Sequence, residues 1–173
     1  AAPHPAKQST TVAPRDADEG FHRIDDARAA ADHWHISLRF GQGVLRNGMD
    51  PLSFIRYLGT FGTVAAIVTL ADGLPEPAAM DPECCYLGFE IAFSSPSADK
   101  AKIESVFEFV IDDCAVRILP PKGRVSEYLA LIRELPEEPE LIGRILVQCG
   151  TLTERKLEAA LATQAEAPAA RLG

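Results

Sequence analysis

WHISLRF, residues 34–40, sets the architecture of this chain. Its side chains alternate between apolar and polar types with a period of two, which is the pattern of a half-buried β-strand. The apolar members are Trp34, Ile36, Leu38 and Phe40, and the polar members are His35, Ser37 and Arg39. Gly41 and Gly43 follow and predict the end of the strand. We therefore expect one strand face on a core and the other in solvent.

Residues 50–62 predict a helix after this strand. Asp50 can accept hydrogen bonds from the free amides of a first turn, and Pro51 is preformed for that turn. Apolar residues then recur at helical spacing, at Leu52, Ile55, Leu58 and Phe61. Gly62 is placed to end the helix.

Two further strands are predicted next. Residues 64–70 form a dense apolar run with β-branched side chains, which favours a strand. A loop with Asp72-Gly73 and three prolines follows. The third strand is predicted by alternating apolar residues at Cys85, Leu87, Phe89, Ile91 and Phe93. Because the two strands are directly connected, we expect them to pair antiparallel.

A second helix and a fourth strand complete the pattern. Ser95-Pro96-Ser97 opens the helix, and Asp99 in its first turn suits the helix dipole. One apolar stripe consists of Ile103, Val106, Phe107, Val110 and Ile111. The fourth strand contains Cys114, Val116 and Ile118, and a double proline ends it.

This order, β-α-β-β-α-β between residues 33 and 120, predicts the fold class. It is typical of an α+β, ferredoxin-like sandwich, in which two helices cover one face of a four-stranded antiparallel sheet. We expect the strand order 4-1-3-2, with right-handed crossovers that join parallel neighbours.

The rest of the chain predicts linkers and a helical extension. Residues 1–31 are rich in Ala and Pro and predict a flexible linker, and residues 165–173 predict another. Between them, residues 125–164 predict a helical extension. It comprises a helix over 125–135 and a helix-turn-helix pair over 141–148 and 153–164, joined at Gly150. Thr151-Leu-Thr-Glu154 fits a capping box.

Composition excludes several classes of function. The chain has 173 residues, a formal charge of −8 and 47% apolar residues. That charge disfavours nucleic acid and anionic membrane surfaces, and no apolar run is long enough for membrane insertion. Four cysteines in a chain with this much core indicate buried thiols rather than disulfides, and therefore a reducing, cytoplasmic location. We interpret the sequence as a piece of a longer chain.

Few residues carry candidate chemistry. His33 and His35 have spacing that can bind a metal, but two neutral ligands make a weak site, so we expect exposed strand residues and no metal. No histidine has a phosphoacceptor setting, and no phosphate-binding or nucleophile motif occurs. We therefore predict no catalytic residue and no cofactor. Carboxylates at Glu104, Glu108, Asp112 and Asp113 predict either a solvated helix face or an acidic docking surface.

Several separated motifs resemble one family. They are WHISLRF, the segment Leu45–Leu52, the segment Asp81–Leu87 and the segment Val106–Cys114. In this order they resemble the region between the phosphotransfer and dimerisation domains of bacterial chemotaxis histidine kinases, the CheA family. The resemblance covers roughly residues 33–120 and implies a small ferredoxin-like domain that docks a response regulator.

The resemblance also implies a mechanism. The domain would bind a CheY-like response regulator in a two-component phosphorelay and raise its effective concentration beside the other domains of the parent kinase. The parent would be an ATP-dependent protein-histidine kinase, whose catalytic parts lie outside this sequence. As docking residues we predict Glu104, Glu108 and Asp112, on the outer face of the second helix.

The C-terminal helical pair suggests an alternative. Ile142-Gly143, Leu146-Val147, Gly150 and Leu157 resemble the small helical motif at the front of type II secretion ATPases, some of which bind cyclic di-GMP. Leu141 stands where the nucleotide-binding version carries Arg. Regulation through cyclic di-GMP or another small ligand is thus the alternative to receiver docking.

Overall fold

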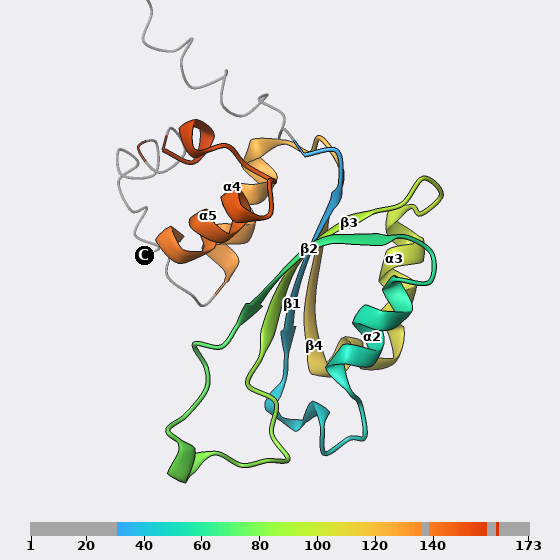
Figure 1. Ribbon diagram of the computed structural model, residues 1–173, viewed down its shortest axis with the longest axis vertical. Helices are drawn as coiled ribbons and strands as arrows, with labels where there is room; N and C mark the ends of the chain where they lie inside the picture. The colour runs from blue at the N-terminus through green and yellow to red at the C-terminus, as the bar shows by residue number, and fades with distance from the viewer. Residues whose placement is uncertain (1–30, 136–138, 159–161, 163–173) are drawn as a thin grey trace, which may run out of the picture.

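The computed structural model describes residues 31–135, 139–158 and 162 (Figure 1). Its strands are β1 (Trp34–Phe40), β2 (Thr63–Leu70), β3 (Gly88–Ser94) and β4 (Cys114–Leu119). Its helices are α2 (Pro51–Leu58), α3 (Lys100–Val106), α4 (Val125–Glu134) and α5 (Pro139–Gln148), with short 3-10 turns η1 (Gln42–Val44), η2 (Pro77–Ala79) and η3 (Glu108–Asp113). The linkers expected at 1–31 and 165–173 lie outside the described residues, apart from Ala31, as do residues 159–161, 163 and 164 of the helix expected over 153–164.

The sheet confirms an α+β class and the expected strand order. The order is β2-β3-β1-β4, which is 4-1-3-2 read from the other edge, and every adjacent pair is antiparallel. The expectation that each crossover joins parallel neighbours is wrong. β1 and β2 run in the same direction, but β3 lies between them and pairs with both.

The first face of the sheet carries the larger apolar core. Alternation in β1 sends Ile36 and Leu38 to this face, where both are fully buried. α2 and α3 cover it, as Figure 1 shows, and contribute Leu58, Ile103 and Val106 to the same cluster. The prediction of an apolar strand face under two helices is therefore confirmed for this side.

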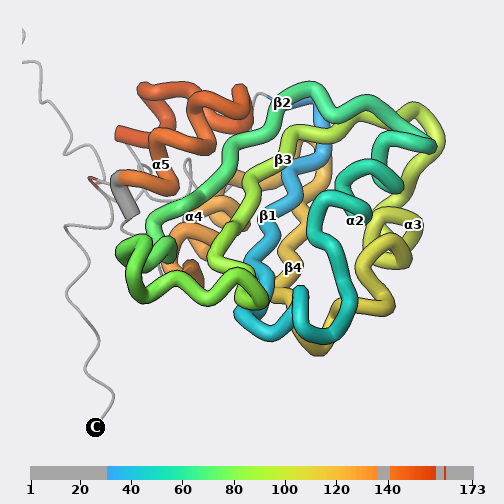
Figure 2. Tube along the Cα trace, turned by 60° about the horizontal axis from the view of Figure 1, so that its bottom comes forward, coloured from blue at the N-terminus to red at the C-terminus, as the bar shows by residue number. Residues whose placement is uncertain are grey.

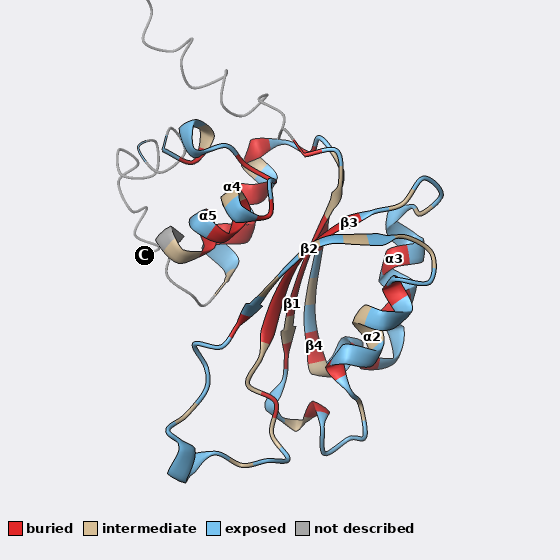
Figure 3. Ribbon diagram, in the orientation of Figure 1, coloured by how far each residue is buried: buried red, intermediate tan, exposed pale blue. Residues whose placement is uncertain are grey.

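The opposite face is also covered, which the sequence did not lead us to expect. α4 and α5 lie against it (Figures 1 and 2). They form a second buried cluster in which Tyr128 and Ile142 pack with Leu70 and Ala92 of the sheet. As a result the central strands are buried on both sides (Figure 3). His35 is 0% exposed, so the expectation that it is an exposed strand residue is wrong.

The first predicted helix is shorter than expected. Asp50 caps it as predicted, since its Oδ1 accepts from the Leu52 amide at 3.0 Å. The helix ends at Leu58 with Gly59 as its cap, and not at Gly62. The role of Gly62 is close approach: a Cβ there would lie 2.2 Å from Phe93 Cζ and 2.7 Å from the Ser94 carbonyl oxygen.

The second predicted helix also changes form. Asp99 is its N-cap and accepts from the Lys102 amide at 2.8 Å. The α-helix ends at Val106 and continues as the 3-10 turn η3. Because a 3-10 turn has three residues per turn, the predicted apolar stripe does not continue and Ile111 is 56% exposed.

Two local predictions at the other elements differ as well. β3 begins at Gly88, so Cys85 and Leu87 belong to the preceding loop. Gly150 has φ +69°, as expected of the residue that ends a helix before a turn. The capping box at Thr151 is wrong, because the Thr151 hydroxyl contacts His35 and the Lys156 amide approaches Thr153 instead.

Candidate functional site

One candidate site is a groove between α3 and the edge strand β4. Its volume is about 660 Å³. Apolar side chains at Ile111, Val116 and Leu119 form part of its wall, and Glu104 and Glu108 line it from α3 and η3. All three predicted docking residues are exposed, but Asp112 does not line the groove.

Charged side chains of both signs line this groove: Glu104 and Glu108 are acidic, and Lys100 and Arg117 are basic. Lys100 Nζ lies 3.7 Å from Glu104 Oε1, and Arg117 donates to Glu134 at 2.9 Å. For Glu108 and Asp112 the structure gives no ion-pair partner among the described residues. Phe109, between these carboxylates in sequence, is 80% exposed. An apolar groove beside the exposed carboxylates of Glu108 and Asp112 suits docking of a protein surface that carries basic and apolar side chains.

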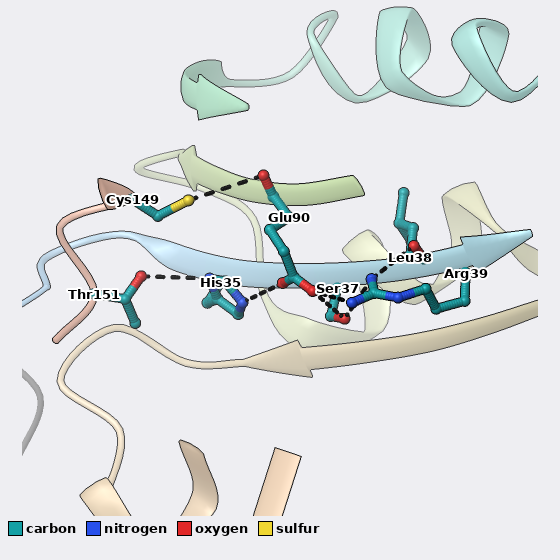
Figure 4. A network of polar contacts seen from close by, with 7 residues as sticks. All are labelled: His35, Ser37, Leu38, Arg39, Glu90, Cys149 and Thr151. Carbon is teal, nitrogen blue, oxygen red and sulfur yellow. Dashed lines mark hydrogen bonds and ion pairs between the residues drawn. The ribbon is translucent and has the colours of Figure 1, made fainter. Parts of the chain in front are cut away.

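A second feature, a buried polar network, lies between the sheet and α4–α5 (Figure 4). Glu90 of β3 is at its centre and is 0% exposed. Its carboxylate accepts from Ser37 Oγ at 2.9 Å and from Arg39 Nη2 at 2.7 Å, and it lies 2.7 Å from His35 Nε2. All three partners come from β1, which pairs with β3 in the register Ser37↔Glu90.

The C-terminal segment takes part in the same network. Thr151 Oγ1 lies 3.3 Å from His35 Nδ1, so each ring nitrogen of His35 faces a polar partner, Glu90 at Nε2 and Thr151 at Nδ1. Cys149 Sγ points to the Glu90 carbonyl oxygen at 3.9 Å. The turn after α5 is therefore held to the central strands by polar contacts as well as by apolar packing.

The electrostatics of Glu90 favour its charged form. Burial alone raises the pKa of a carboxyl, but the hydrogen bond and charge of His35 and the charge of Arg39 outweigh it, so that the pKa of Glu90 lies below its ordinary value. The Arg39 side chain is 15% exposed, and its other terminal nitrogen, Nη1, donates hydrogen bonds to Ser37 Oγ and to the Leu38 carbonyl oxygen. Glu90 and Arg39 therefore form a buried ion pair whose charged groups are also hydrogen-bonded.

The two strand histidines have different surroundings. His35 belongs to the network, whereas His33 Nε2 is buried and has no hydrogen-bond partner among the described residues. Burial and the neighbouring His35 lower the pKa of His33. Across 31–135, 139–158 and 162, no group of three or more His, Cys, Asp or Glu side chains is placed to hold a metal ion.

Sequence reasoning missed this network, although a signal was present. GFEIAFS, residues 88–94, carries one charged residue in an otherwise apolar strand. Glu90 faces the same side as the polar residues of β1. A carboxylate at the middle of a central strand, opposite Ser and next to His and Arg, indicates burial with partners.

Comparison with known proteins leaves the family open: no family model, curated protein or solved structure matches this chain. All four cysteines are free; Cys85, Cys114 and Cys149 are buried as predicted, whereas Cys84 is partly exposed. Within the part of the chain that the structure describes, no helix has the length and apolar character needed to span a membrane.

Proposed function

We propose that this chain is a non-catalytic docking module of a chemotaxis-type histidine kinase. In this proposal residues 33–120 are a ferredoxin-like domain that binds a CheY-like response regulator and keeps it near the phosphotransfer machinery of the parent protein. The parent is then a cytoplasmic signalling kinase, and the domain itself supplies affinity rather than chemistry.

One observation carries the proposal: η3 exposes the carboxylates of Glu108 and Asp112 next to an apolar groove. Glu104 and Glu108 line that groove, and Phe109 and Ile111 expose apolar surface beside them. Interfaces need this combination, because apolar contacts supply affinity and rim charges supply orientation and association rate. The element order and strand order agree with the fold that the sequence resemblance implies.

The test is a calorimetric titration of the full chain with a CheY-like receiver. We expect the double substitution Glu104→Lys/Glu108→Lys to weaken receiver binding at least tenfold, because it replaces both carboxylates that line the groove with cations. Glu83→Lys is the matched control, since Glu83 is 76% exposed and lies on the distant loop before β3. Equal binding by the double variant and the native chain would exclude the α3 face.

The same chain can be titrated with cyclic di-GMP while backbone amide shifts are followed by NMR. Shifts on α3, η3 and β4 with the receiver support the docking proposal. Shifts confined to residues 141–158 with cyclic di-GMP, and none with a receiver, would replace it with the small-ligand alternative.

A further inference from the structure

The two edges of the sheet differ in how they are protected. β4 carries Arg117 at its exposed middle, and a charged side chain on an edge strand discourages pairing with another strand. β2, the other edge, has the sequence TVAAIVTL, with no charged residue and no proline. No described residue pairs with its outer side, so its backbone N–H and C=O groups are available there.

β2 is also long and mostly regular. It has eight residues, and the one irregularity in its pairing with β3 is a bulge between Val64 and Ala66, near its start. Ile67, on the α2 side of the strand, is 44% exposed. An uncharged edge of this length with an exposed branched side chain is a template for strand addition.

An apolar hollow lies at the end of this edge. Its volume is about 550 Å³, and Thr69 of β2 lines it together with Leu52, Leu74 and Met80. Leu52 is 46% exposed, and Leu74 and Met80 are each 43% exposed. Directly opposed residues of paired strands share one face of the sheet, so a residue opposite Thr69 would direct its side chain toward this hollow.

The charge around the hollow selects the partner. The loop over residues 71–87 contains Asp72, Glu76, Asp81 and Glu83 and has no Lys or Arg. Arg46 from outside the loop pairs with Asp81 and approaches Glu83. A second copy of this chain would bring another acidic loop and a further charge of −8, so charge repulsion opposes self-pairing.

We propose that β2 and the hollow beside it form a second docking surface, which accepts an extended peptide segment with alternating apolar side chains and Lys or Arg. The segment adds a fifth strand next to β2, one apolar side chain enters the hollow, and the negative charge of the loop at the end of this edge attracts its basic residues. This surface is on the opposite edge from the α3–β4 groove, so the proposal does not depend on receiver docking.

The probe is a fluorescein-labelled ten-residue peptide in which Lys alternates with Val and one central Val is replaced by Phe. Two matched peptides test the chemistry: one has Glu in place of Lys, and one is N-methylated at alternate residues so that it cannot complete a strand pairing. We expect the Lys peptide to bind the full chain at least tenfold more tightly than either matched peptide in fluorescence anisotropy.

Variants locate the binding. Ile67→Lys places a charge at the β2 edge and should weaken peptide binding at least tenfold. Ala115→Lys is the matched control, because Ala115 is an exposed residue of the other edge strand and should leave binding unchanged. Met80→Lys, in the loop, repeats the test at the hollow if the strand variant fails to fold by circular dichroism.

Three outcomes would overturn the inference. The first is that the Lys peptide does not bind at concentrations up to about 1 mM. The second is that Ile67→Lys and Ala115→Lys weaken peptide binding equally. The third is that the chain forms a dimer in sedimentation and Ile67→Lys abolishes it. The last result would assign the edge to a second copy of the chain.

Discussion

Replacing Glu90 with alanine removes the acceptor on which three side chains of β1 converge. His35 is 0% and Ser37 is 1% exposed, and the Arg39 side chain is 15% exposed. None of them gains access to bulk water when the carboxylate is lost. The substitution therefore removes the carboxylate that pairs with a largely buried guanidinium and accepts from two buried polar groups.

The expected magnitude follows from that geometry. Removing one partner of a buried, hydrogen-bonded ion pair costs about 3 to 5 kcal/mol. This corresponds to a loss of about 150-fold to 5000-fold in the folding constant. With a urea m value of about 2 kcal/mol/M, the unfolding midpoint should fall by about 1.5 to 2.5 M. Glu90→Gln keeps the shape and one acceptor oxygen, so it should cost less, about 1 to 3 kcal/mol.

Urea unfolding followed by circular dichroism measures both variants. Glu83→Ala is the control: its carboxylate is 76% exposed and 3.8 Å from Arg46, so it should change stability by less than about 1 kcal/mol. A midpoint shift below about 0.5 M for Glu90→Ala, with an unchanged m value, would refute the claim that this network holds the sheet and the C-terminal helices together.

Three further predictions concern pH, packing and thiols. The folded pKa of Glu90 lies below its ordinary value of 4.5, so the contribution of its charged form to stability is complete above that value and is lost as the pH falls through the lower folded pKa. The urea midpoint of Glu90→Gln should therefore fall less than that of the native chain between about pH 5 and pH 3, and parallel curves would contradict this. Gly62→Ala should lower the free energy of unfolding by about 1 to 3 kcal/mol in calorimetry, because the new methyl group meets an aromatic ring and a carbonyl oxygen. Gly43→Ala is the control and should be close to neutral, since a Cβ there has no atom within 4 Å. Equal melting temperatures for the two variants would contradict this prediction. Burial raises the pKa of Cys114 to about 12, so this thiol should react slowly with iodoacetamide at pH 8. Mass spectrometry after a brief treatment should find Cys84, which is partly exposed, labelled and Cys114 unlabelled. Equal labelling would show that the core opens readily.

Local sequence patterns predicted the sheet because its determinants are local. Alternation in β1 assigns Ile36 and Leu38 to one face whatever the rest of the chain does. The strand order followed from the direct connection between β2 and β3 and from the β-α-β-β-α-β order of the elements. The cap at Asp50 was predictable for the same reason, since a capping side chain needs only its own helix.

The placement of α4 and α5 was not predictable in this way. Their apolar stripes show that each must bury a face, but they do not say against which surface. The polar side of β1, with His35 and Ser37, indicated solvent when that strand was considered alone. Once Glu90 lies opposite Ser37, the polar side chains on this face hydrogen-bond to one another, and the face can therefore be buried.

That burial has a consequence for the two proposed docking surfaces. Because helices cover both faces of the sheet, its two edges remain for binding partners. The groove at β4 and the uncharged strand β2 lie at opposite edges of the sheet. The network around Glu90 lies between them, within β1 and β3, and fixes the register of the strands that connect the edges. A partner at one edge therefore meets a rigid surface, because breaking the buried ion pair would cost more than a typical rim contact provides. On this basis we expect the two surfaces to bind independently, so that receiver affinity at the β4 groove is the same with and without the Lys peptide at β2, and a change greater than about threefold would show that the sheet transmits strain between its edges.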